Sequence, residues 1–327
     1  MIGTEFLPGQ GLGNRLFCYV TARALAADRG VPFGTAGRRF LRADFLDLDL
    51  GEEIPDERVA SFHRYEEAEK RLYLKNSPHD MVHGCYVAGA DPGLREAPDN
   101  SLLYGNLQDE SYFAAHRSEL GRWLAVKPAF DTYEYTADDL CILNVRGGEY
   151  ADDPALFLRA RYWKDAMALM RRENPAMRFL IVTDDVEAAG RLLPGIPARH
   201  FSPEGDYAAV KNARYLIASN SSFAVLPAYT SRTLQKAIAP MYWARHNVSD
   251  GYWASAQNIY SIFTYLDRAG RPHSAQECRE QLAQYRFPQT RPWPADAPAV
   301  EAVRRAAERK RLAQRAIQKA GRLLRGL

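Results

Sequence analysis

The hydrophobic pattern divides the chain into two parts of different character. Residues 2–8 predict a short strand, a Gly-rich turn follows, and apolar positions at a spacing of 3.6 residues predict a helix over 15–29. Residues 30–125 give little regular pattern, because the Asp, Glu and Pro content of 51–100 indicates long connections. From residue 139 onward, short apolar runs alternate with amphipathic segments.

This second part predicts a parallel sheet. We expect strands over 140–145, 178–182, 198–201, 215–218 and 235–239, and helices over 163–171, 186–193, 207–213 and 223–229. Continuous apolar strands that alternate with helices are typical of a parallel sheet covered on both faces. Ligands of such sheets bind at the carboxyl ends of the strands. The segments to consider are therefore 146–150, 183–185, Asp206, 219–223 and 240–245.

Composition narrows the class of protein. The 327 residues, 46% of them hydrophobic and 25% charged, indicate a globular chain of two domains. We expect an N-terminal domain over 1–130, a C-terminal domain over 131–295 and a helical tail over 296–327. The first residues carry no signal-peptide pattern and no window is apolar enough to span a bilayer, which predicts a cytoplasmic protein. The four cysteines predict buried, reduced thiols, and the seven histidines show no metal-binding spacing.

The positive charge lies at the C-terminus. Residues 301–327 hold nine Lys and Arg against two Glu, a charge of +7, so a total of +3 leaves −4 for residues 1–300. A body of that charge excludes a nucleic-acid partner. The tail predicts a basic helix that either contacts an anionic membrane surface peripherally or lies solvated beside the body.

The Gly-rich turn over 9–14 lacks the dinucleotide fingerprint, because Asn14 stands where the last glycine is needed. Gly11, Gly13 and Asn14 either bring backbone close to a ligand or form a tight strand-to-helix turn. An oxidoreductase is thereby disfavoured.

Polar residues at the expected strand ends suggest a diphosphate site. Arg146 offers a planar fork for diphosphate oxygens, or it forms a plain ion pair with Glu149. Of Asp184 and Asp185, one is expected to cap the next helix and the other to accept from ribose hydroxyls. Hydroxyls at a helix start favour an oxyanion or phosphate, although N-capping explains one serine. This helix start comprises Ser219, Asn220, Ser221 and Ser222.

Four segments resemble motifs of the bacterial α-1,2-fucosyltransferases. The run Gly11-Leu12-Gly13-Asn14-Arg15-Leu16-Phe17 resembles their Gly-Gly-Leu-Gly-Asn-Gln-Met-Phe opening, and Arg146 through Tyr150 resembles their His-x-Arg-Arg-x-Asp-Tyr motif. Thr183-Asp184-Asp185 is similar to their Ser-Asp-Asp, and 219–223 to their Asn-Ser-Ser-Phe-Ser-Trp-Trp segment. The departures fall on contacts to base and sugar: Asn144 replaces the His, Gly147 the second Arg, Glu149 the Asp, and Ala224-Val225-Leu226 the Ser-Trp-Trp.

The resemblance implies an α/β fold of GT-B type, with two Rossmann-like parallel-sheet domains and the site in the cleft between them. It also implies inverting, metal-independent transfer of fucose or a related sugar from a GDP-sugar to a glycan hydroxyl, in surface polysaccharide synthesis and without a cofactor. Arg146, Glu149 and Asp152 are the expected catalytic residues, with Asp153 as a further base candidate. The expected donor-binding residues are Gly11, Gly13, Asn14, Asn144, Arg146, Asp184, Asp185, Asp206, Ser219, Asn220, Ser221 and Ser222.

Two alternatives stay open. A non-catalytic protein that binds a nucleotide or sugar would keep the fold without the chemistry. The aromatic residues of 240–260 form either a sugar-stacking platform or part of the core.

Overall fold

The computed structural model describes residues 1–68, 71–74, 85–86, 89–249, 256–285, 290–292, 298, 301–302, 305–306, 308–309 and 312–313. The chain divides into two compact units, 1–68 with 89–285 and 69–88 with 286–327. The first unit holds two sheets and every residue of the site discussed below. The second unit holds a three-stranded antiparallel sheet in the order β15 (Thr290–Pro292), β5 (Arg71–Leu74) and β6 (Cys85–Tyr86).

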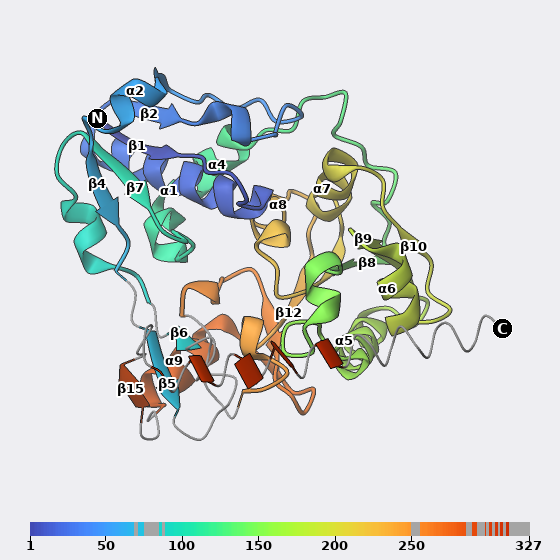
Figure 1. Cartoon of the computed structure of the whole chain (residues 1–327). Helices are drawn as coiled ribbons and strands as arrows, with labels where there is room; N and C mark the ends of the chain where they lie inside the picture. The colour runs from blue at the N-terminus through green and yellow to red at the C-terminus, as the bar shows by residue number, and fades with distance from the viewer. Residues whose placement is uncertain are drawn as a thin grey trace. The chain divides into compact units, whose positions relative to one another are not determined.

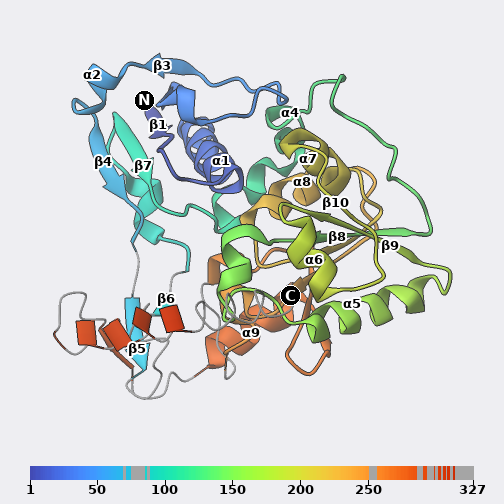
Figure 2. The ribbon, with the colours of Figure 1, turned by 45° about the vertical axis from the view of Figure 1, so that its right-hand side comes forward.

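The first sheet of the first unit has five parallel strands in the order β3-β2-β1-β7-β4. Its strands are β1 (Ile2–Glu5), β2 (Phe33–Ala36), β3 (Glu52–Ile54), β4 (His63–Glu66) and β7 (Ser101–Tyr104). Helix α1 (Leu12–Arg29) connects β1 to β2 and lies beside β1 in both views (Figures 1 and 2). The shorter helices α2 (Asp56–Val59) and α4 (Arg117–Trp123) belong to the connections.

The second sheet has seven strands in the order β10-β9-β8-β11-β12-β13-β14, all parallel except β14. Its strands are β8 (Leu140–Val145), β9 (Arg178–Thr183), β10 (Ala198–Arg199), β11 (Tyr215–Ala218), β12 (Lys236–Pro240), β13 (Thr264–Leu266) and β14 (Pro272–His273). The helices are α5 (Ala160–Glu173), α6 (Val186–Leu192), α7 (Pro203–Lys211), α8 (Val225–Tyr229) and α9 (Ala275–Gln284).

Strand β8 shows why this sheet is covered on both faces. Cys141, Leu143 and Val145 pack in one core with Trp163 of α5. Alternate residues of the strand, such as Ile142, pack in another core that includes α7 and α8. Helices α5 and α7 accordingly lie on opposite sides of β8 (Figures 1 and 2). That second core also contains the buried residues of α1, so the two sheets share one hydrophobic core.

The structure confirms the predicted α/β fold with two parallel sheets, and it confirms the predicted strands and helices of 140–240 with shifts at their ends. Helix α1 begins at Leu12 instead of residue 15. Helix α7 begins at Pro203 instead of residue 207, because Ser202 caps it and proline suits the first helical position. The strands that were not predicted are β2, β3, β4, β5, β6, β7, β13, β14 and β15.

The expected buried thiols are confirmed for Cys18, Cys141 and Cys278, whereas the side chain of Cys85 lies outside the described residues. No helix in the described part of the chain is both long and apolar enough to cross a membrane. The described residues between 298 and 313 have helical backbone, and Arg305 pairs with Glu301 at 3.1 Å. Most of the tail lies outside the described residues, so the basic helix stays a prediction, as do the domain boundaries at 130 and 295.

Candidate functional site

A pocket of about 190 Å³ lies at the carboxyl ends of strands β8 and β9. This position agrees with the expectation for parallel sheets, whose ligands bind at that edge. Leu12, the first residue of α1, also lines this pocket, so the helix that follows β1 of the first sheet contributes to it. The lining residues are Leu12, Asn144, Val145, Arg146, Thr183, Asp184, His200, Pro203, Asp206, Ser221 and Phe223. We call this space the donor pocket, because several of the donor-binding residues that the sequence predicts are among these.

Arg146 is the cation of the donor pocket. It follows the end of β8. Its Nη1 atom donates to the Asp184 carboxylate, and its Nη2 atom donates to Glu149 Oε1 at 3.1 Å. The side chain is 34% exposed and the ring of Tyr150 lies 5.6 Å from its Cζ. The predicted ion pair with Glu149 is therefore present. The guanidinium has five N–H donors and is partly exposed. Some of these donors therefore remain available to a ligand when both carboxylates are bound.

The two aspartates after β9 have separate tasks, and the predicted helix cap is confirmed for Asp185, whereas the ribose contact of the other aspartate stays a prediction. Asp185 caps α6, accepting from the backbone N–H of Ala188 at 2.9 Å. Asp184 accepts from the backbone N–H of Gly147 at 2.7 Å and lines the donor pocket. Gly147 is required by close packing, since a Cβ there would lie 2.4 Å from the Cβ of Asp185.

Asp206 and His200 form a second polar pair in the donor pocket. Asp206 is 5% exposed, accepts from the backbone N–H of Phe201 at 3.0 Å, and lies 2.6 Å from Nδ1 of His200. Burial raises the pKa of the Asp206 carboxyl, although those two partners oppose the shift. The His200 side chain is 46% exposed. This pair is suited to hydrogen bonds with hydroxyl groups or to proton transfer.

The polar run after β11 is divided among different structural tasks. Ser221 lines the donor pocket and accepts from the N–H of Phe223 at 3.3 Å, capping a short 3-10 turn. Ser222 donates to Asn14 Oδ1 at 2.6 Å, and Asn220 donates to the carbonyl of Leu156 at 2.9 Å. Ser219 is 2% exposed and its hydroxyl has no partner in the described part of the chain. Only Ser221 of this run faces the donor pocket.

The start of α1 lies against this polar run. A Cβ at Gly13 would lie 2.6 Å from the carbonyl carbon of Ser222, so only glycine permits this approach. Asn14 Oδ1 accepts from both Ser222 and Gln108 Nε2, the latter at 3.0 Å. Gly11 precedes α1 without a capping side chain, and a Cβ there would meet nothing within 4 Å. Helix α1 therefore presents uncapped amides next to Leu12, where an anion would be favoured.

Of the expected site residues, five line the donor pocket: Asn144, Arg146, Asp184, Asp206 and Ser221. Asn144 is 6% exposed and donates to the carbonyl of Val182 at 3.5 Å. The remaining expected donor-binding residues do not line it, although all of them except Asn14 and Ser219 adjoin a lining residue in the sequence. These residues are Gly11, Gly13, Asn14, Asp185, Ser219, Asn220 and Ser222. Glu149 does not line the pocket but pairs with Arg146, which does, and its side chain is 74% exposed. Asp152 is exposed on the turn that follows.

Sequence reasoning did not assign His200 to the site. The predicted strand ran to Phe201, but β10 ends at Arg199, so His200 stands at the carboxyl edge. In the aromatic segment, Trp243 is 5% exposed and packs 6.1 Å from the ring of Tyr260, which confirms core packing for that residue. Tyr252 and Trp253 lie outside the described residues. Across the described chain, no group of three or more His, Cys, Asp or Glu could hold a metal ion.

Comparison with known proteins gives matches among solved structures alone. No family model matches the chain, and no curated protein matches it. POFUT1 in complex with GDP-fucose is similar at 9% identity and a TM-score of 0.44, over 73% of this chain and 97% of that one. The E. coli heptosyltransferase WaaC with ADP is similar at 11% identity and a TM-score of 0.41, over 86% and 99%. NodZ α-1,6-fucosyltransferase with GDP is similar at 14% identity and a TM-score of 0.39, over 73% and 95%.

Proposed function

We propose that the chain is an inverting glycosyltransferase of GT-B type that takes its sugar from a nucleoside-diphosphate donor. The observation that carries the proposal is the donor pocket itself. It combines the Arg146 guanidinium, the Ser221 hydroxyl and the uncapped start of α1 at the carboxyl edge of a parallel sheet. These are the groups that bind a diphosphate.

The chemistry asks the protein chiefly to stabilise the leaving diphosphate. As the bond to the anomeric carbon breaks, negative charge grows on the diphosphate oxygens. Preorganised donors aimed at that charge supply the largest catalytic contribution in many enzymes. Arg146 has this role in the proposal, since it is held in place by Asp184 and Glu149. Ser221 and the first amides of α1 assist it.

A carboxylate is proposed to remove the proton of the acceptor hydroxyl. Glu149 and Asp152 are exposed and lie on the turn that follows Arg146, and Glu149 pairs with Arg146. Asp206 is a third candidate, because burial raises the pKa of its carboxyl toward the range in which a general base works best. Comparing Glu149→Gln, Asp152→Asn and Asp206→Asn separates them. The base is the residue whose loss lowers kcat and leaves nucleotide affinity unchanged.

The proposed donor is a GDP-sugar that carries fucose or a related sugar, and the proposed acceptor is a glycan hydroxyl in surface polysaccharide synthesis. Support for this finer statement comes from the four sequence segments at 11–17, 146–150, 183–185 and 219–223. The test supplies purified protein with a panel of GDP-sugars and a cell-derived glycan acceptor, and measures free GDP. Release of GDP that depends on acceptor, with inversion at the anomeric carbon, is expected. Tight GDP binding without release from any donor would favour the non-catalytic binding protein.

Transfer is proposed to need no metal ion, because the positive charge on the diphosphate comes from Arg146 and the start of α1. Activity should therefore survive EDTA. Loss of activity in EDTA with rescue by manganese would contradict this.

We also propose that the protein works in the cytoplasm with peripheral contact between residues 301–327 and an anionic membrane. The charge of +7 in this tail supports the contact, at about 1 kcal/mol for each basic residue near the surface. Deleting 301–327 should move the protein from anionic liposomes into the supernatant at low salt, while transfer to a soluble acceptor continues. Equal partitioning with and without the tail would contradict the contact.

A further inference from the structure

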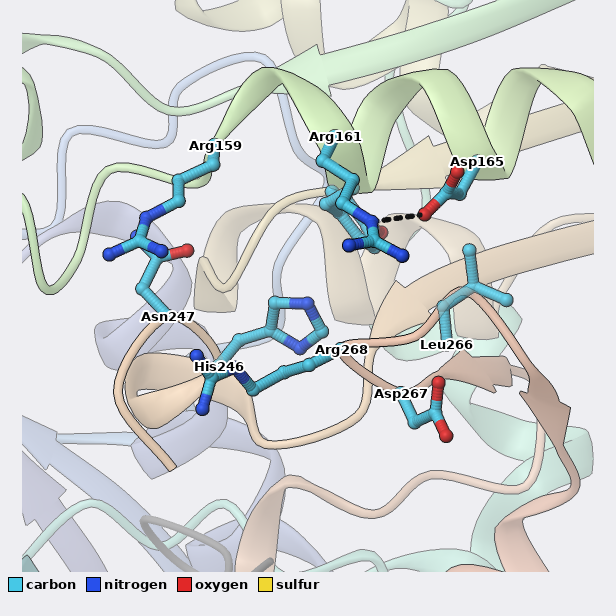
Figure 3. Close-up of a pocket in the computed structure, with 9 residues that line it drawn as sticks. Arg159, Arg161, Asp165, His246, Asn247, Leu266, Asp267 and Arg268 are labelled. Atoms are coloured by element: carbon cyan, nitrogen blue, oxygen red, sulfur yellow. Dashed lines mark hydrogen bonds and ion pairs between the residues drawn. The ribbon is translucent and has the colours of Figure 1, made fainter. Parts of the chain in front are cut away.

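A second pocket, of about 120 Å³, lies elsewhere on the carboxyl edge of the same sheet. It is bounded by the start of α5, by the segment that follows β12, and by the end of β13 (Figure 3). Its lining residues are Arg159, Arg161, Tyr162, Asp165, His246, Asn247, Leu266, Asp267 and Arg268, none of which lines the donor pocket. We call it the arginine pocket.

Three arginines and two aspartates line the arginine pocket, and both aspartates already have partners. Asp267 is 7% exposed and accepts from the N–H groups of Ala269 and Arg271, at 2.8 and 2.9 Å, and from Arg271 Nε at 2.7 Å. Asp165 contacts Arg161 at 3.4 Å.

The two carboxylates of the pocket therefore do not neutralise Arg159 and Arg268. Arg268 donates to the carbonyl of Ser249, and neither side chain has a carboxylate partner among the residues that the structure describes. An anion entering the pocket would supply the missing partner.

His246 adds a buried polar group that points into this pocket. Figure 3 shows its imidazole between Arg161 and Arg268. The residue is 4% exposed and its Nδ1 atom has no hydrogen-bond partner within the described chain. Burial, helped by Arg268, lowers the pKa of the imidazole to about 4, so the ring is neutral at pH 7. A buried ring nitrogen without a partner is costly, and a ligand that meets it removes that cost.

The start of α5 contributes in the same direction. The helix has 14 residues and begins at Ala160, and Arg159, the residue before it, makes no capping hydrogen bond with its side chain. Its first N–H groups and the positive end of its dipole favour a negative charge at this place. Cationic side chains, helix start and buried imidazole thus converge from three segments of the chain.

We propose that the arginine pocket binds an oxyanion of phosphate size, either a free ion or a phosphate ester on a sugar. Planar guanidinium groups match the geometry of phosphate oxygens, and the neutral imidazole can donate one further hydrogen bond. The arginine pocket is separate from the donor pocket, but hydrogen bonds to the segment 154–157 connect residues in or next to each of them. Asn247 donates to the carbonyls of Pro154 and Phe157 at 3.0 and 2.7 Å, and Asn220 donates to Leu156 between them.

The test titrates full-length protein with inorganic phosphate by calorimetry, in the presence of saturating GDP so that the donor pocket is filled. Arg159→Gln combined with Arg268→Gln should weaken phosphate binding at least about tenfold, because two charge-assisted contacts are lost. The matched control is Arg172→Gln with Arg191→Gln, which removes the same charge from exposed positions outside the pocket. The control should change affinity by no more than about twofold. Glucose 6-phosphate and glucose are then titrated separately, to show whether the pocket prefers a phosphate ester or the free ion.

Tighter binding of glucose 6-phosphate than of inorganic phosphate, with no binding of glucose, identifies an ester, and equal binding identifies the free ion. Either result supports the site. No saturable binding of phosphate or its ester, binding that GDP abolishes, or equal binding by both double variants would overturn it. Failure of GDP itself to bind would count against the proposed glycosyl transfer alone.

A spectroscopic readout places the ion. The ring signals of His246, identified by their loss in His246→Gln, should shift during the phosphate titration, while those of the exposed His63 should not. A His246 signal that stays unchanged at saturating phosphate would also overturn the proposal.

Discussion

Replacing Gly13 by alanine tests the close approach of α1 to the polar run after β11. A Cβ at Gly13 would lie 2.6 Å from the carbonyl carbon of Ser222, 2.7 Å from the nitrogen of Phe223 and 2.8 Å from the carbonyl oxygen of Ser222. Carbon atoms in ordinary contact are about 3.5 to 4.0 Å apart. All three neighbours are backbone atoms, so α1 has to move. Overpacking of this kind costs about 1 to 3 kcal/mol.

The assay is thermal unfolding together with GDP titration. Gly13→Ala should lower the melting temperature by about 2 to 5 °C for a body of this size. It should also weaken GDP binding, because Leu12 of the donor pocket moves with α1.

Gly190→Ala is the matched control. Gly190 lies inside α6, where a Cβ would meet nothing within 4 Å, so helix propensity should raise stability by about 0.5 to 1 kcal/mol. If Gly13→Ala melts and binds GDP like the wild type, α1 does not approach Ser222 this closely and the description of the pocket is wrong.

Three further predictions concern single groups. Arg146→Lys should lower transfer at least about tenfold with the circular dichroism unchanged, because an ammonium cannot make bidentate contact with diphosphate, and wild-type turnover would remove Arg146 from the site. Ser221→Ala should weaken GDP binding, whereas Ser222→Ala should lower the melting temperature, since Ser222 donates to Asn14 and does not line the donor pocket; the reverse assignment would contradict the structure. His246 has a pKa of about 4 in the fold against 6.5 unfolded, so its contribution to stability is complete above pH 6.5 and is lost as the pH falls through 4. As the pH is lowered across this range, the melting temperature of His246→Gln should fall less steeply than that of the wild type. An equal pH dependence of the two melting temperatures would show that His246 does not titrate in this way.

The central strands β8, β9, β11 and β12 of the second sheet were predictable because most of their residues are buried. All six residues of β8 are buried, and the sequence shows an apolar run that is interrupted only by Asn144. Apart from β1, the strands of the first sheet give no such signal. Strand β3 exposes two of its three residues and β4 exposes three of its four, so neither an apolar run nor a clean alternation marks them. Strand β7 is fully buried but only four residues long.

The candidate site was predictable where it depends on strand ends. Arg146 and Asp184 follow strands whose ends the sequence marks clearly, and they meet at the sheet edge as expected. The contact between Asn14 and Ser222 joins residues 208 positions apart, which no local pattern records. The pattern at Gly13 resembles a ligand-binding turn, but the structure shows that packing against backbone requires the glycine. Burial of Asp206 depends likewise on where α7 begins.

A crystal structure of the protein with GDP shows whether the donor pocket binds a diphosphate. We expect the diphosphate to lie in the donor pocket, with its oxygens within hydrogen-bond distance of the Arg146 guanidinium and the Ser221 hydroxyl and close to the first amides of α1. GDP bound away from these groups, with Arg146 still paired only to Asp184 and Glu149, would contradict it.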